Sequence, residues 1–261
     1  MADFTKTPSY FNNKETFEKY LGQTSYYLAL QDAVEKIIRI TKPSKVLELG
    51  SATGATTIKL AKLFKNINFI GVDMRSDVTA IATKEAEENK ITNVDFSTAD
   101  MCEIVGTKLD EDLIYLLYSY HHILDPIEMK INFLQDAYKN MKNKSFLCIA
   151  ETFIPETATD LGDSEEILNL WRVRKEEGAA STFWKALTSF KESDLDLTHQ
   201  IAEYSRENEY LAGELVAKRQ DEYLIKRSWL ADIGIKIGFK IIINEPVNAL
   251  GDGVVLFIKE Q

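Results

Sequence analysis

The feature that most constrains the fold is the stretch of residues 46–54, VLELGSATG. An apolar run carrying one acid, Glu48, ends at Gly50, and a second glycine follows at Gly54. Residues 55–64 then place apolar side chains at helical spacing. This order predicts a buried strand, a tight turn of small residues and the start of a helix. A ligand can approach bare backbone at such a turn, near the positive end of the helix.

A second apolar strand is expected over residues 67–72, and it ends at Asp73. In nucleotide-binding sheets, an acid at this point, roughly 20 residues beyond the glycines, accepts hydrogen bonds from a ribose. The alternative is a solvated acid that caps the next helix. A dinucleotide fingerprint needs a third glycine, but Gly54 is followed by Ala55. The sequence therefore favours a nucleoside ligand of another kind.

The pattern Glu-x-Gly-x-Ala-x-Gly of residues 48–54 resembles motif I of the class I S-adenosylmethionine (SAM)-dependent methyltransferases. Ala52 stands at the middle glycine, a replacement common in that family. Asp73 matches the ribose-binding acid, and Asp100-Met101 match the adenine-binding pair. Residues 112–126 resemble the fourth-strand motif, with a His-His pair before Asp-Pro.

The resemblance covers about residues 30–155 and 226–260 and implies SAM as the cofactor. The residues that it implies for binding this cofactor are Glu48, Gly50, Ser51, Ala52, Gly54, Asp73, Met74, Asp100, Met101 and Tyr118.

Strand and helix patterns alternate between residues 45 and 151, which predicts an α/β fold with helices on both faces of the sheet. Specifically, we expect a doubly wound, Rossmann-like, seven-stranded and mostly parallel sheet, with a helical N-terminal segment and a helical insertion after the fifth strand. The family resemblance implies that the final strand is antiparallel and lies between its neighbours. The expected strands are 45–49, 67–72, 93–97, 112–118, 145–151, 240–244 and 253–259. The expected helices are a pattern between Gly22 and Ile40, the stretches 54–65, 77–89 and 127–141, and a last helix that begins near Trp229 and ends at Gly238.

The chain is expected to divide into a helical cap (1–40), a SAM-binding core (41–155 and 226–261) and a helical insertion (156–225). The insertion is either a lid over the substrate or a dimer element, so a homodimer is one expectation. Aromatic residues of the cap and the insertion are candidates to line the substrate pocket, or else they pack these helices onto the core. These residues are Tyr10, Tyr20, Tyr26, Tyr27, Trp171 and Trp184.

Methyl transfer from a sulfonium mostly requires alignment of the reactants, but a neutral hydroxyl or protonated amine also needs a base. His121 and His122 follow the fourth strand, and histidine suits this role near neutral pH. One of the two is expected to face the pocket as a base or orienting group; the alternative is that they cap the next helix. Glu151, at the end of the fifth strand, either fixes a substrate amine or anchors its loop.

Composition argues against several classes of binding partner. The formal net charge of −10 and the lack of a dense Lys/Arg block argue against nucleic acid and anionic membranes. Two cysteines and three histidines give no disulfide framework and no metal-ligand cluster, so no metal is expected. Without an apolar signal core or spanning stretch, a cytoplasmic protein is expected.

The motifs of amino-methyltransferases (Asn/Asp-Pro-Pro-Tyr/Phe) and of cytosine-C5 enzymes (Pro-Cys) do not occur after the fourth strand, where Tyr118-Ser-Tyr-His stands. We therefore expect an enzyme (EC 2.1.1.-) that methylates O or N of a small molecule. One alternative is a peptide or protein methyltransferase that docks its substrate on the insertion. Another is a SAM-binding protein without turnover.

Overall fold

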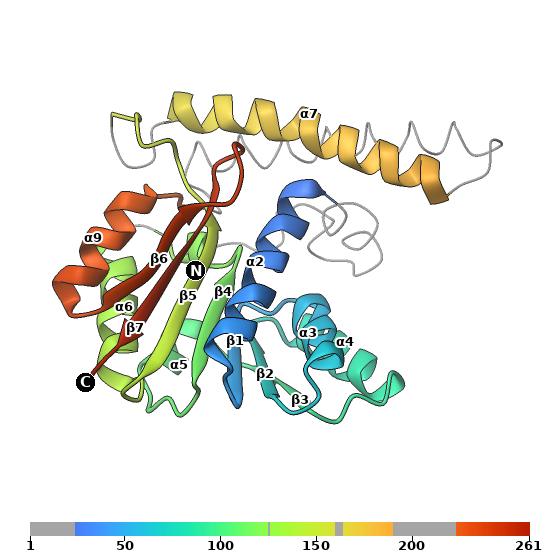
Figure 1. Cartoon of the computed structure of the whole chain (residues 1–261), viewed down its shortest axis with the longest axis vertical. Helices are drawn as coiled ribbons and strands as arrows, with labels where there is room; N and C mark the ends of the chain where they lie inside the picture. Colours follow the sequence, from blue (N-terminus) through green and yellow to red (C-terminus); the bar gives the residue numbers. More distant parts are fainter. Residues whose placement is uncertain (1–23, 125, 160–163, 190–222) are drawn as a thin grey trace.

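The protein is built on one seven-stranded sheet with the strand order β3-β2-β1-β4-β5-β7-β6 (Figure 1). This computed structural model describes residues 24–124, 126–159, 164–189 and 223–261. Strands β1 to β5 are parallel, and β7 runs antiparallel between β5 and β6. The predicted fold class is therefore confirmed, including the antiparallel last strand. The strands are β1 (Lys45–Leu49), β2 (Asn68–Asp73), β3 (Val94–Thr98), β4 (Leu113–Leu117), β5 (Ser145–Thr152), β6 (Lys240–Pro246) and β7 (Asp252–Lys259).

Helices cover both faces of the sheet, as the alternating pattern predicts. One face packs against α2, α3 and α4, and the other against α5, α6 and α9. Of the described helices, the short α5 is one that periodicity did not predict. The bounds are α2 (Ser25–Thr41), α3 (Ala55–Leu63), α4 (Ser76–Glu88), α5 (Met101–Val105), the 3₁₀ turn η4 (Tyr120–His122), α6 (Glu128–Asn140), α7 (Ser164–Ser189) and α9 (Arg227–Ile237).

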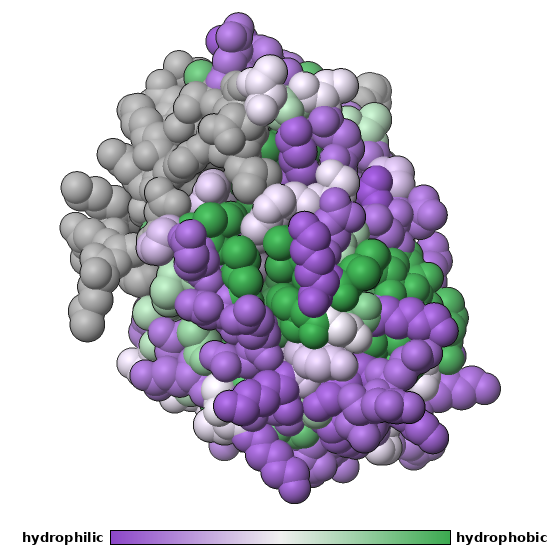
Figure 2. All heavy atoms as spheres, turned by 90° about the vertical axis from the view of Figure 1, so that its left-hand side faces the viewer, coloured by the Kyte–Doolittle hydropathy of each residue, from purple (hydrophilic) through white to green (hydrophobic). Residues whose placement is uncertain are grey.

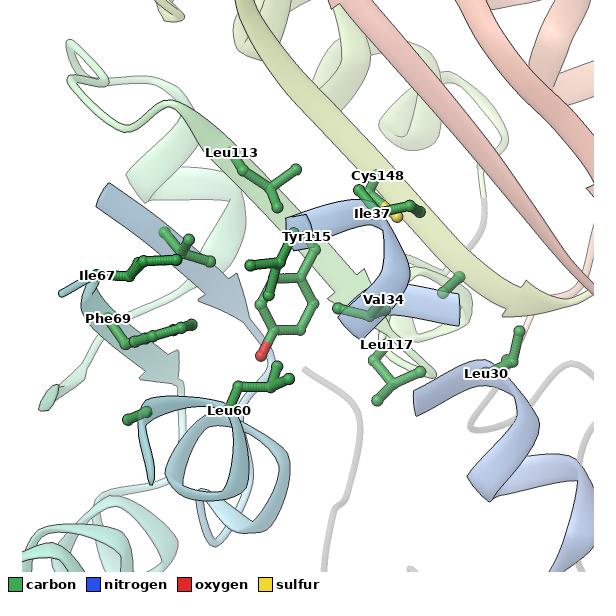
Figure 3. Close-up of a cluster of buried hydrophobic side chains, with 14 of the residues drawn as sticks. Leu30, Val34, Ile37, Leu60, Ile67, Phe69, Leu113, Tyr115, Leu117 and Cys148 are labelled. Atoms are coloured by element: carbon green, nitrogen blue, oxygen red, sulfur yellow. The ribbon is translucent and has the colours of Figure 1, made fainter. Parts of the chain in front are cut away.

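The central strands are buried on both faces because each face has its own hydrophobic cluster. On the α2 side, Leu30 and Val34 of the helix lie over Tyr115 and Leu117 of β4 (Figure 3). The alternate residues Ile114 and Leu116 of β4 belong to the cluster on the opposite face. This double burial explains why the strands appear in the sequence as continuous apolar runs.

The chain leaves β1 toward β2 and β3 on one side and later returns to add β4 and β5 on the other. The strand order therefore reverses between β1 and β4, where α/β sheets bind their ligands beyond the carboxyl ends of the strands. Helix α7 runs across the end of the sheet at which β5 ends and β7 begins (Figure 1).

Strand β6 forms one edge of the sheet, next to α9. Figure 2, which shows the molecule from this side, has hydrophobic areas set among hydrophilic ones. Exposed apolar side chains on these two elements include Ile235 of α9 and Ile242 of β6. Among the described residues, no helix is long and apolar enough to cross a membrane.

Candidate active site

The turn after β1, residues 50–54, lies between the end of β2 and the residues that follow β4. Gly50 and Ser51 donate backbone hydrogen bonds to the carbonyl oxygen of Val72, at 2.8 and 2.9 Å. Gly50 has φ +81°, and a Cβ atom there would lie 2.4 Å from Cβ of Ser119. A side chain at Gly50 would thus meet both backbone strain and a neighbouring residue. Glycine at this position lets the ends of β1 and β4 touch.

Asp73 at the end of β2 packs directly against this turn. Its carboxylate oxygens accept hydrogen bonds from the backbone amides of Ala52, at 2.9 Å, and Arg75, at 3.0 Å. Burial raises the pKa of Asp73, whereas these two amides lower it. Met74, the next residue, is exposed. The predicted ribose acid and the glycine turn therefore lie side by side.

The end of β3 joins the same group because the amide of Ala99 donates to the carbonyl of Asp73 at 3.0 Å. Asp100 caps α5: its carboxylate accepts from the amide of Cys102 at 2.7 Å. Met101 is partly buried against the core. The predicted adenine-binding pair thus lies one short connection beyond Asp73, and its contact with a nucleoside stays a prediction.

Two details of the turn suit a bound ligand. The hydroxyl oxygen of Ser51 is buried and has no hydrogen-bond partner among the described residues. Gly54 precedes α3 in a left-handed conformation, and no side chain caps that helix. A buried polar atom without a partner is costly, and an uncapped helix start leaves free amides. A ligand with polar groups would satisfy both.

Glu48 lies beneath the turn, inside the protein. Its carboxyl group accepts a hydrogen bond from the Tyr115 hydroxyl at 2.8 Å and is also bonded to the Thr57 hydroxyl. Burial raises the pKa of Glu48 to about 7. The side chain thereby ties β1 to β4 and to the first turn of α3. Direct contact of Glu48 with a cofactor stays a prediction, since the observed partners belong to the protein.

This buried acid makes folding stability depend on pH. The unfolded chain releases the proton near pH 4.5, whereas the folded protein keeps it to about pH 7. The free energy of unfolding is therefore expected to fall across this interval, by about 3 kcal/mol for Glu48 alone. Urea denaturation at pH 5 and pH 8 measures it. Glu48→Gln should lack that loss, and Glu87→Gln, at an exposed site on α4, should retain it. An equal loss in both variants would contradict the assignment.

A second polar group lies beyond β4, where Glu151 and the two histidines form a chain. Nδ1 of His121 is 2.8 Å from Oε1 of Glu151, and Nε2 of His121 is 3.2 Å from Nε2 of His122. The two rings meet edge to face, with centroids 4.2 Å apart. Side chains of adjacent residues often point in different directions, but the 3₁₀ turn η4 brings these two rings together. Helix α6 starts after its N-cap residue Ile127, whose own side chain makes no capping hydrogen bond.

Glu151 is held as a hydrogen-bond acceptor inside the protein. Besides the imidazole, its oxygens accept from the backbone amides of Thr152, at 2.8 Å, and His121, at 3.2 Å. Glu151 and His121 are buried, and His122 is partly exposed. A carboxylate at this distance from Nδ1 can stabilise an imidazolium at His121.

Most of the predicted pocket aromatics that the structure describes gather above β4. Tyr27, whose hydroxyl is bonded to Thr56, stacks on Tyr118, a predicted cofactor-binding residue with φ 52°. Tyr26 and Trp171 are buried. These side chains pack α2 and α7 onto the core, and their contact with a substrate stays a prediction. Tyr10 and Tyr20 lie outside the described residues, as does the side chain of Trp184 in α7.

Sequence reasoning missed an ion pair that joins α7 to the sheet. Nη1 of Arg174 lies 2.8 Å from Oδ1 of Asp252, and both side chains are buried. The guanidinium also lies 4.0 Å above the ring of Tyr26. Asp252 in turn accepts from the Thr152 hydroxyl at 2.8 Å. Nothing in the spacing of Arg174 and Asp252 signals the pairing. The described residues contain no group of three or more His, Cys, Asp and Glu that could hold a metal ion.

Comparison with known sequences agrees with this geometry. Residues 40–209 match the family described as "Methyltransferase domain". A release factor glutamine methyltransferase from Haemophilus influenzae is 36% identical over 90 residues, covering 31% of this chain and 30% of the relative. A tRNA (guanine-N(7)-)-methyltransferase from Pediococcus pentosaceus is 40% identical over 58 residues, covering 22% of this chain and 27% of the relative. The chain thus spans less than a third of the length of either relative.

Solved structures share the fold at low sequence identity. The mitomycin 7-O-methyltransferase MmcR has a TM-score of 0.59 at 15% identity, with 94% of this chain and 57% of that chain covered. Human N-acetylserotonin methyltransferase, solved with SAM, has a TM-score of 0.54 at 12% identity, with 91% and 57% covered. Since the family match extends over more than half of the sequence, the chain belongs to the methyltransferase domain family.

Proposed function

We propose that the protein is a SAM-dependent methyltransferase that acts on O or N of a small-molecule acceptor. One observation carries the proposal. Ser119 packs on Gly50 of the turn, and two residues later His121 pairs with buried Glu151. The end of β4 thus links the predicted cofactor turn to a base within one short segment.

The residues of the turn fit SAM. The unpartnered Ser51 hydroxyl and the close backbone at Gly50 and Gly54 leave polar atoms for the cofactor. The Asp73 carboxylate can accept hydrogen bonds from ribose hydroxyls, and the uncapped start of α3 offers backbone amides. When bound, SAM supplies a methyl group already activated on a sulfonium.

The protein's own contribution is to align the acceptor and take its proton. The acceptor's hydroxyl or amine gives its proton to the histidine pair while the lone pair of its oxygen or nitrogen forms the new bond to carbon. The resulting positive charge is located on His121, whose Nδ1 lies 2.8 Å from Oε1 of Glu151. Partly exposed His122 is the outer end of this chain. Alanine variants of His121 and His122 identify the imidazole that contacts the acceptor.

We also propose the domain division 1–40, 41–155 with 226–261, and 156–225, in which the insertion acts as a lid. The contacts of Arg174 in α7 with Asp252 and with the ring of Tyr26 support this role. The alternative is a dimer element, and the two roles can coexist; gel filtration of the wild-type protein at several concentrations shows whether the protein dimerises. Cytoplasmic location and the lack of membrane and nucleic-acid partners belong to the same proposal.

The acceptor class is tested with radiolabelled SAM and a metabolite extract. Label in small products supports the proposal. Label in protein or in RNA would instead point to a macromolecular acceptor. Both fractions are measured because the similar proteins include a release factor glutamine methyltransferase and a tRNA methyltransferase. Binding of SAM without any transfer would indicate a cofactor-binding protein.

The cofactor site is tested by calorimetry with Asp73→Asn. This change removes the charge that ribose hydroxyls would meet, and hydrogen bonds to charged groups contribute about 1.5–3 kcal/mol each. We therefore expect SAM affinity to fall about 10- to 100-fold. Asp77→Asn is the matched control, because Asp77 is exposed four residues later on α4. Equal affinities in the two variants would refute the ribose assignment.

A further inference from the structure

Lys130 in the first turn of α6 is a lysine in an unusual place. Its side chain is fully buried, although lysine is almost never found so unless it is paired. Its Nζ donates a hydrogen bond of 2.7 Å to the carbonyl oxygen of Tyr120, and the Tyr120 hydroxyl donates to the carbonyl of Lys130 at 3.0 Å. The ammonium lies 4.5 Å from the ring of Tyr120 and 5.6 Å from that of Tyr223.

These contacts connect Lys130 to the histidine pair. Tyr120 immediately precedes His121 in η4, so the ammonium holds the carbonyl at the start of this turn. The amide of Tyr223 donates to the carbonyl of His121 at 2.8 Å. Lys130 and Tyr223 therefore fix the backbone on both sides of the imidazole that bonds to Glu151.

Charge links the same groups. Burial lowers the pKa of Lys130 to about 7, and the Glu151 carboxylate, followed by the Cys102 thiol, acts in the opposite direction. Burial raises the pKa of the Cys102 thiol to about 11, so at neutral pH it is uncharged. Below about pH 7 the ammonium is charged, and this is the range in which an imidazole titrates. The groups around His121 thus include the buried carboxyl group of Glu151, the buried amino group of Lys130 and the partly exposed imidazole of His122.

We propose that Lys130 is a positioning residue that offsets the charge of Glu151 and so keeps His121 neutral and able to accept a proton near pH 7. Without the ammonium, Glu151 alone would favour the imidazolium. His121 would then already be protonated when the acceptor binds and could not take its proton. The same ammonium holds η4 through the Tyr120 carbonyl. This role in turnover rests on the proposed methyltransferase function.

The test is an NMR titration of the whole 261-residue chain labelled at histidine nitrogens, without cofactor or acceptor. Because the sequence has three histidines, few imidazole signals need to be assigned. In Lys130→Met, the midpoint of the His121 signal is expected to rise by about one pH unit. Lys139→Met, at an exposed lysine of the same helix, should titrate like the wild type. Coincident titrations of the Lys130→Met and Lys139→Met variants would overturn the proposal.

A second variant separates charge from packing. Lys130→Gln loses the charge but retains a donor for the Tyr120 carbonyl, so the same rise is expected, and it carries the test if Lys130→Met does not fold. A wild-type midpoint in Lys130→Gln would show that the lysine serves only the turn. In turnover assays, the acidic limb of the kcat profile should move upward in parallel. Since the titration needs no turnover, it tests this charge balance even if no methyl transfer is found.

Discussion

Replacing His121 with alanine is expected to lower kcat about 10²- to 10⁴-fold, the usual contribution of a general base. SAM affinity should change by no more than about twofold, because the glycine turn and Asp73 are bonded to each other and not to this ring. The physical reason is the pairing of His121 with Glu151, which stabilises the charge that a base acquires. Steady-state kinetics at saturating SAM and calorimetry with SAM measure the two effects.

Two further variants locate the base within the chain. Glu151→Gln retains the size of the side chain but removes its charge, so kcat should fall while SAM binding persists. His122→Ala removes the outer ring: a loss as large as that of His121→Ala assigns the acceptor contact to His122, and a small one assigns it to His121. Wild-type turnover in both histidine variants would remove the pair from the mechanism.

The centre of the sheet was predictable because the central strands are buried on both faces. Continuous apolar runs and the glycines at 50 and 54 fix β1 and the following helix, and the alternation with amphipathic segments fixes the rest. The grouping of the candidate site residues was predictable for a different reason. Residues that directly follow parallel strands lie together at one edge of the sheet. Asp73 contacts the Ala52 amide, and Glu151 contacts His121, as strand ends at one edge allow.

The missed features depend on pairing between distant residues. Lys130 stands beside ordinary surface residues of an amphipathic helix, and only the fold shows that it is buried under Tyr120. Glu48 belongs to a cofactor motif, yet its carboxyl group is bonded to Tyr115, 67 residues later. The sequence shows which residue types are present, but the partner of a buried charge depends on which elements become neighbours.

The largest expected effect on stability concerns Arg174. Its guanidinium is bonded to Asp252 at 2.8 Å and to the carbonyl of Leu250 at 3.1 Å. Arg174→Met would leave the Asp252 carboxylate buried without its cation. Removing one partner of a buried pair costs about 3–5 kcal/mol, and we expect a loss of this size in the free energy of unfolding. Urea denaturation followed by circular dichroism measures it.

The matched control is Arg172→Met, two residues earlier on α7, where the side chain is exposed and bonded to Asn169. That change should stay within about 0.5 kcal/mol of the wild type. Adding Asp252→Asn to Arg174→Met removes the uncompensated charge, so the double variant should be more stable than Arg174→Met alone. If Arg174→Met and Arg172→Met are equally stable, the pair does not anchor α7. In that case the proposed closure of α7 over the strand ends loses the support of this ion pair.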